Sequence, residues 1–503
     1  MMVVLDRGCT TGEVWGPDRR QPSESRTGAR RYFILVLPSH IAATRESQYI
    51  PLVGCLFSVP TCSENPAAIM HHFFRSTFFD FEAIRILGTA GYGGAELGEF
   101  LEAAGQIREN DPDSWHRAWA EQAVKAEEVA QDALSRGHCA AARSAFLRSS
   151  NYTRASCYMM VGDRLGLSDP RVGPILRKAT DLFQSATRLF EGAVHQLTIP
   201  YIHESNAGKE EQLELPGYLF LPPRSRLLPG GKTPVLVSFI GADSIQEEIY
   251  YMFPAAAPEL GYAVLTIEGP GQGLTLHDKG VPSRGDWEVV SKAVLDYLVT
   301  YGKDHPDMGL DLDRVAVAGA SLGGYMALRA ATDPRVKACV AVDPPYDMYD
   351  FATKHAAPTL FGLWERGWVP DSVVNMIISL GTRFSFQMRH EIFSTSRMLG
   401  ASSPVELLRA MRKFTLRDYL GSVKCPVLVT GAADSLYFDV DENTMAISRG
   451  LPPQTHKELW IGSTPGGGSL QAKMGALARC NQQALAFLDR QLGIVRAAPD
   501  RER

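Results

Sequence analysis

The residues most suited to chemistry are a serine between two glycines, in the segment Gly319-Ala-Ser-Leu-Gly323. The apolar run 315–318 precedes this segment, and a helix-prone stretch, 325–331, follows it. A strand that turns sharply into a helix strains the residue at the turn and leaves little room for neighbouring side chains, which favours glycine on both sides. The pattern G-x-S-x-G in this context predicts a nucleophile elbow with Ser321 at its tip.

An acidic partner for Ser321 is expected on a loop after a later strand. In hydrolytic triads built on such an elbow, the chain order is nucleophile, acid and histidine. Asp434 directly follows the apolar run 427–430 and the short segment Gly431-Ala-Ala433, so we predict that it is the catalytic acid. The less favoured acids are Asp439, Asp343 and Asp347.

The histidine of such a triad is missing from its expected place. It should follow the last apolar run, 458–461, but no histidine occurs in residues 457–503. His456 precedes that run and is expected on the surface. Because loss of the histidine costs a serine protease on the order of 10⁶ in turnover, ester hydrolysis here would need another base. The candidate bases are Asp434, Lys473, His71, His72, His355 and His390.

Backbone N–H groups around Ser321 are predicted to form an oxyanion hole. One donor is the N–H of Leu322, directly after the serine. The second comes from the loop after the first core strand, at Gly241 or Ala242. Such donors stabilise the negative oxygen of an enolate or alkoxide.

Two nearby segments have simpler explanations. Glu247 and Glu248 fit the first turn of a helix, where carboxylates are favoured. The segment Gly269-Pro-Gly-Gln-Gly273 is expected to be a tight turn in the pocket wall. It does not match G-x-G-x-x-G, so we predict no phosphate or nucleotide site there.

Short apolar runs separated by helical segments predict a sheet that positions these residues. The core runs are 235–240, 262–267, 315–318, 338–342, 427–430 and 458–461. They are apolar throughout, as is typical of parallel strands covered on both faces. Residues 195–202 and 215–221 alternate and predict an entry hairpin. The fold class is therefore α/β, with a mostly parallel, doubly wound sheet.

Two helical segments are expected outside the sheet, one before its strands in the sequence and one inserted between two of them. Apolar spacings of three and four predict an N-terminal helical cap within 70–194, with helices from Asp111, over 140–160 and after Pro174. A second lid is expected at about 346–417, inserted into the main domain, 195–495. Residues 1–69 are expected to be a peripheral or disordered extension, and 496–503 a tail.

Composition limits the partners. The 503-residue chain has a formal net charge of −5 and no long basic run, which excludes a nucleic-acid-binding role. Its eight cysteines include no C-x-x-C pair, so they are expected to be reduced, and no metal or other cofactor is predicted. No apolar run reaches 18 residues, so no membrane span is expected, and we predict a cytoplasmic protein. The sequence leaves a homodimer open.

Six motifs of this chain occur together. They are Met70-His-His-Phe-Phe74, Leu215-Pro-Gly-Tyr218, Gly241-Ala-Asp-Ser244, Glu268-Gly-Pro-Gly-Gln-Gly273, Gly319-Ala-Ser-Leu-Gly-Gly324 and Gly431-Ala-Ala-Asp434. This combination resembles the fungal α/β-hydrolases of polyketide and nonribosomal-peptide hybrid pathways, including the fusarin and cytochalasan types. The resemblance spans about residues 70–495 and extends to heptaketide and pseudooxynicotine-type C–C hydrolases.

That wider group implies an α/β-hydrolase fold, an N-terminal helical cap and a Ser-Asp-His triad that cleaves a C–C bond beside a carbonyl. Ser321 and Asp434 match the triad. Where the wider group has its histidine, this chain has the segment 467–473, which resembles the G-L-Q-A-K pattern of the fusarin and cytochalasan subgroup. The departure therefore belongs to the subgroup.

The leading hypothesis is an enzyme of secondary metabolism that acts on a polyketide–amino acid intermediate and promotes pyrrolidinone or pyrrolinone ring closure. Condensing an aldehyde with an acidic C–H between two carbonyls needs a modest base and an oxyanion hole. The alternatives are a C–C or ester hydrolase with a substitute base, and a catalytically silent module that shields a reactive intermediate.

Overall fold

The computed structural model describes residues 70–204, 210–354 and 357–496. An eight-stranded sheet forms the centre of this part, in the order β1-β2-β4-β3-β5-β6-β7-β8. Its strands are β1 (Val194–Glu204), β2 (Glu210–Phe220), β3 (Thr233–Phe239), β4 (Ala263–Ile267), β5 (Leu310–Ala320), β6 (Val336–Val342), β7 (Val427–Ala432) and β8 (Lys457–Gly462). β1 and β2 form the predicted antiparallel hairpin, β2 also pairs antiparallel with β4, and the remaining pairs are parallel.

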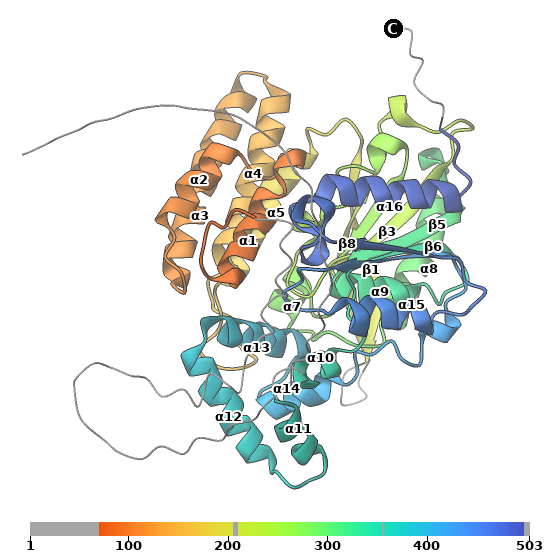
Figure 1. Ribbon diagram of the computed structural model, residues 1–503. Helices are drawn as coiled ribbons and strands as arrows, with labels where there is room; N and C mark the ends of the chain where they lie inside the picture. The colour runs from red at the N-terminus through yellow and green to blue at the C-terminus, as the bar shows by residue number, and fades with distance from the viewer. Residues whose placement is uncertain (1–69, 205–209, 355–356, 497–503) are drawn as a thin grey trace, which may run out of the picture. The chain divides into compact units, whose positions relative to one another are not determined.

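Helices cover both faces of the sheet, which explains why its central strands are apolar throughout. Val235, Val237 and Phe239 of β3 pack in one cluster with α8 (Glu288–Asp304) and α9 (Leu322–Ala330). Leu236 of the same strand packs in the opposite cluster with α16 (Leu477–Gln491) and with helices of the N-terminal segment (Figure 1). The prediction of an α/β class with a mostly parallel, doubly wound sheet is confirmed.

The N-terminal segment contains five helices, two more than the apolar spacing predicted. They are α1 (Thr77–Leu87), α2 (Leu97–Gln106), α3 (Pro112–Ser135), α4 (Cys139–Cys157) and α5 (Val172–Thr187), coloured orange to yellow in Figure 1. Asp111 starts α3 as expected, because its side chain accepts the N–H groups of Asp113 and Ser114. The spacing did not predict α1 because its polar residues are buried together with its apolar ones, so no single apolar stripe marks it.

The insertion between β6 and β7 is helical. It consists of α10 (Met348–Lys354), α11 (Pro358–Glu365), α12 (Asp371–Phe384), α13 (Phe386–Leu399) and α14 (Pro404–Met411). Figure 1 shows these helices grouped beyond one end of the sheet. Three further short helices connect the core: α6 (Gln246–Ile249), α7 (Gly273–Lys279) and α15 (Ala446–Gly450).

Several expectations lie partly outside the described residues. The extension 1–69, most of the tail 496–503, and His355 are among them. The division of the chain at 194 into a cap and a hydrolase domain stays a prediction. In the described part, no helix is long and apolar enough to cross a membrane, and no group of three or more His, Cys, Asp or Glu residues could hold a metal ion.

Candidate active site

The elbow has the strained geometry that its sequence predicts. Ser321 lies between β5 and α9 with φ 54° and ψ −123°, a region that side-chain-bearing residues rarely occupy. Its backbone N–H donates to Val342 O at 2.8 Å, which ties the elbow to the end of β6. A Cβ on Gly319 would lie 2.2 Å from Gly323 O, and one on Gly323 would lie 2.4 Å from Phe239 O. Both glycines are therefore required by close backbone packing.

The predicted oxyanion loop lies against this elbow. A Cβ placed on Gly241 would lie 3.5 Å from Ala320 O, so the loop after β3 contacts the backbone just before Ser321. Within the described residues, neither the Leu322 nor the Ala242 N–H has a hydrogen-bond acceptor. These two groups remain available to a negative oxygen, which is the requirement for an oxyanion hole.

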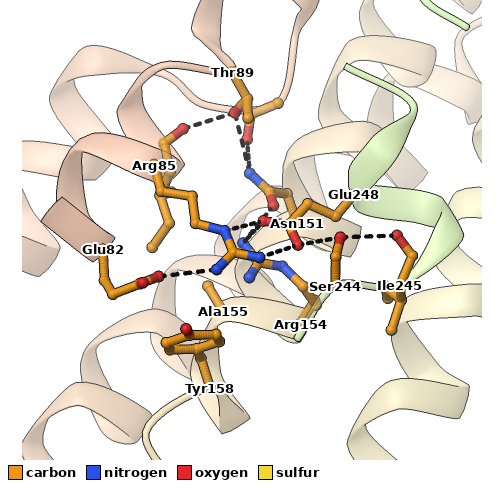
Figure 2. A network of polar contacts seen from close by, with 12 residues as sticks. Glu82, Arg85, Thr89, Asn151, Arg154, Ala155, Tyr158, Ser244, Ile245 and Glu248 are labelled. Carbon is orange, nitrogen blue, oxygen red and sulfur yellow. Dashed lines mark hydrogen bonds and ion pairs between the residues drawn. The ribbon is translucent and has the colours of Figure 1, made fainter. Parts of the chain in front are cut away.

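A buried ionic network anchors the oxyanion loop to the N-terminal helices (Figure 2). Arg85 of α1 donates from Nε and Nη2 to the two carboxylate oxygens of Glu248, both at 2.6 Å. Its Nη1 donates to Asp243, next to Ala242, at 2.7 Å. Arg154 of α4 lies 3.1 Å from the same Glu248 carboxylate. The side chains of Arg85 and Glu248 are each only 7% exposed, so this pair is a buried bidentate ion pair.

The charges in this network balance. Burial opposes ionisation of Asp243, but Arg85 and the Tyr158 hydroxyl outweigh it and lower the pKa of Asp243 to about 2. Burial raises the pKa of Glu82 to about 7, despite the nearby Arg85. Below that pH two guanidinium groups thus face two carboxylates. The sequence predicted that Glu247 and Glu248 only favour the first turn of a helix. This was incomplete, because Glu248 also pairs with Arg85 of α1 and Arg154 of α4, which are over 90 residues away in sequence.

The loop after β8 has a lysine near the place expected for the histidine. All hydrogen-bond donors of this lysine's ammonium group are already used. Lys473 Nζ donates to Gly431 O at 2.7 Å and Gly468 O at 3.0 Å, and it lies 2.8 Å from Asp343 Oδ1. An ammonium group has three donors, and all three are used. The two charged side chains are 0% and 2% exposed. We therefore assign Lys473 to holding together the loops after β6, β7 and β8, and not to proton abstraction.

The Asp343–Lys473 pair also changes how the acidic candidates are interpreted. Asp343 accepts the Thr430 hydroxyl at 2.6 Å, while burial raises its pKa against the effect of Lys473. Asp347 pairs with Arg417 at 3.0 Å, and Asp439 caps the helical segment Val440–Met445. These three carboxylates have structural partners. Asp434 is half-buried, its N–H donates to Ser469 O at 2.9 Å, and no described group bonds its carboxylate.

The described histidines do not replace the missing triad member. His390 of α13 is buried and donates from Nε2 to Tyr158 O at 2.7 Å, while His72 contacts Asp80 at 2.8 Å. His71 is exposed, and the predicted surface position of His456 is confirmed by its exposed contact with Glu458. Among the described residues, no side chain hydrogen-bonds the Ser321 hydroxyl. The catalytic roles of Ser321 and Asp434 stay predictions.

A cavity of about 160 Å³ adjoins the oxyanion loop. Ala242, Asp243 and Ser244 form part of its wall, α4 and α5 contribute apolar side chains, and α13 of the insertion closes another side. Ser321 is not one of its lining residues. The cavity therefore lies next to the predicted oxyanion loop but does not include the elbow.

Several fungal hydrolases are similar in sequence to nearly the whole described chain. A protein named hydrolase ORFZ from Pyricularia oryzae is 50% identical over 85% of this chain and 99% of its own length. Hydrolyase ccsE from Aspergillus clavatus is 49% identical over 85% and 99% of the two chains. The model of the alpha/beta hydrolase family matches residues 235–465. The chain belongs to the fungal α/β-hydrolases. The family predicted from the motifs is thus confirmed.

Solved structures agree with this α/β-hydrolase fold. The structure of 2,6-dihydroxy-pseudo-oxynicotine hydrolase has a TM-score of 0.56 and 18% identity, covering 82% of this chain and 98% of its own. The structure of AbyA5 has a TM-score of 0.50 and 16% identity, covering 80% and 95%. At these identities the likeness shows the fold alone.

Glu268 gives this α/β-hydrolase a predicted pH response. Its carboxylate, at the end of β4, accepts the N–H of Leu274 at 2.8 Å, and burial, aided by Glu247, raises its pKa to about 8. Because the pKa is 4.5 in an unfolded chain, the stabilisation is complete below about pH 4.5 and is lost as the pH rises toward 8. The loss amounts to at most about 1.4 kcal/mol per pH unit.

The variant Glu268→Gln has no proton to lose. We expect its melting temperature, relative to that of the unmodified protein, to rise steadily between about pH 5 and about pH 8. Thermal unfolding followed by circular dichroism measures this difference. Glu128→Gln, on the exposed surface of α3, is the control and should show a constant difference. A constant difference for Glu268→Gln as well would contradict the raised pKa.

Proposed function

We propose that this protein is an enzyme of fungal secondary metabolism that acts on a polyketide–amino acid intermediate and promotes closure of a pyrrolidinone or pyrrolinone ring. The observation that carries the proposal is the combination of free oxyanion donors with a serine that lacks a histidine partner in the described chain. The named relatives, called hydrolases and hydrolyases, support membership of a biosynthetic hydrolase family.

The proposed reaction is a condensation within one molecule. A base removes a proton from the carbon between two carbonyl groups, and the enolate oxygen is held by the N–H groups of Leu322 and Ala242. The enolate carbon attacks the aldehyde carbon, one C–C bond forms, and the resulting alkoxide takes up the proton. Loss of water then gives the unsaturated ring. Asp434 is the proposed base. Its carboxylate has no partner in the described chain, and the residue lies just after the carboxyl end of β7.

Ser321 is assigned to the wall of the oxyanion site. In this proposal its hydroxyl donates a hydrogen bond to the developing oxyanion, and the strained elbow that holds Ser321 supports this role. A covalent role is the second candidate, favoured by the elbow geometry itself: Ser321 would be the nucleophile of a C–C or ester hydrolase with a non-standard base. A fluorophosphonate probe separates the two, because only an activated serine is labelled.

The test uses N-acetoacetyl-phenylalaninal, which carries both reacting groups. We expect the full chain to convert it to the 3-acetyl pyrrolinone, detected by mass spectrometry, and Ser321→Ala to lower the rate by about 10²-fold. Asp434→Asn should lower it at least as much. Ser372→Ala, an exposed serine of α12, is the control. Cyclisation at an unchanged rate in both site variants would refute the proposed site.

A further inference from the structure

The cavity beside the oxyanion loop contains an arginine that has no counter-ion among the described residues. Arg397 of α13 donates from Nη2 to Leu276 O at 3.0 Å, a backbone acceptor that carries no net charge. Its Nε is buried and has no hydrogen-bond acceptor in the described part of the chain. No carboxylate of the described residues lies within ion-pair distance of it. A buried N–H without an acceptor is unfavourable, so this guanidinium can pair with an anionic group that arrives from outside the described chain.

The rest of the wall does not neutralise Arg397. Burial and the nearby Arg397 lower the pKa of His277 to about 4, so that imidazole is neutral near pH 7. Asp243 is the carboxylate of the lining, with 42% of its side chain exposed, but it is already paired with Arg85 and Tyr158. Arg154 also lines the cavity and is paired with Glu248, so the unbalanced charge is that of Arg397. The cavity therefore has an excess of positive charge.

Much of the remaining lining is apolar, which reduces the screening of this charge, although Ser168, Ser394 and Thr395 also contribute polar groups. Cys157, Met160, Leu176, Ile245 and Met398 contribute to the wall. In such a setting a charge–charge interaction is screened less than in water. An apolar cavity with a few convergent polar groups is the usual form of a small-molecule site.

We infer that this cavity binds an anionic oxygen of the small-molecule substrate, with Arg397 as its counter-ion, and that the anion is the enolate of a 1,3-dicarbonyl group. The inference rests on the proposed function: a 1,3-dicarbonyl enolate shares its charge between two oxygens, one held by the oxyanion donors and the other paired with Arg397. Ala242 joins the two sites, since it supplies an oxyanion donor and lines the cavity. A carboxylate would offer the same charge, and the experiment distinguishes the two.

The experiment measures binding by titration calorimetry without turnover. The probes are 5-benzylpyrrolidine-2,4-dione, which is an enolate at pH 8; 5-benzylpyrrolidin-2-one, its neutral counterpart; and N-acetylphenylalaninate, a carboxylate. We expect the full chain to bind the enolate about tenfold or more tightly than the neutral lactam, and more tightly than the carboxylate. Arg397→Gln removes the charge and keeps a polar amide, so it should remove the preference while lactam binding changes by less than about twofold.

The matched control is Arg383→Gln, which removes the same charge from an exposed position at the end of α12 and should keep the preference. Arg397→Lys should restore part of it, and melting temperatures verify that each variant is folded. Equal affinity for enolate and lactam, or an unchanged preference in Arg397→Gln, would overturn the inference. Tighter binding of the carboxylate would overturn the enolate assignment. The binding measurement needs no turnover, so its result can be interpreted even if the cyclisation assay fails.

Discussion

Replacing Arg85 with methionine is expected to destabilise the protein by about 3–5 kcal/mol and to lower turnover by about 10²-fold or more. The stability loss arises because the buried Glu248 loses its bidentate cation and keeps only Arg154 and the Ser244 hydroxyl as partners among the described residues. The loss of activity arises because Asp243, next to the Ala242 donor, is no longer held by α1. Urea unfolding measures the first effect, and the cyclisation rate of the folded fraction measures the second.

The control for Arg85 is Arg75→Met, which removes a cation from an exposed position just before α1. It should change stability by less than about 0.5 kcal/mol. A double variant, Arg85→Met with Glu248→Gln, should lose less stability than the sum of the two single changes, because the residues contact each other. Full turnover by a folded Arg85→Met protein would show that the network is only structural and does not position the oxyanion loop.

Lys473→Met is expected to cost about 3–5 kcal/mol of stability, because Asp343 would remain buried without its cation. The loops after β6, β7 and β8 would also lose their common hydrogen-bonding centre at Gly431 O and Gly468 O. The expected readout is a lower midpoint of urea unfolding. The activity per folded molecule should stay unchanged, since the lysine takes no part in proton transfer. Total activity should therefore fall only as far as the folded fraction falls.

Adding Asp343→Asn to Lys473→Met should restore part of the lost stability, because the uncompensated charge is removed. Lys424→Met, an exposed lysine, is the control and should be close to neutral. The assignment is wrong if Lys473→Met is as stable as the unmodified protein yet inactive. That outcome would indicate a direct catalytic role for the lysine.

The elements that the sequence predicted well are those with a local signal. The elbow was predictable because Gly319 and Gly323 are required by contacts within a few residues and with one adjacent strand. The buried strands were predictable because burial on both faces demands apolar residues at every position. The start of α3 was predictable because Asp111 caps it locally. In contrast, α1 was not foreseen, since its buried charged residues find partners only in the tertiary structure.

The sequence alone determined the fold class, the family, the position of Ser321 and the absence of a histidine after β8. These follow from backbone sterics and strand burial, which depend on neighbouring residues, and from motifs shared with relatives. Only the tertiary structure decided that Lys473 pairs with Asp343, that Arg85 anchors the loop after β3, and that Arg397 lacks a counter-ion among the described residues. The reason is physical: the partner of a buried charge is set by which distant elements the fold brings together, and spacing along the chain does not record it.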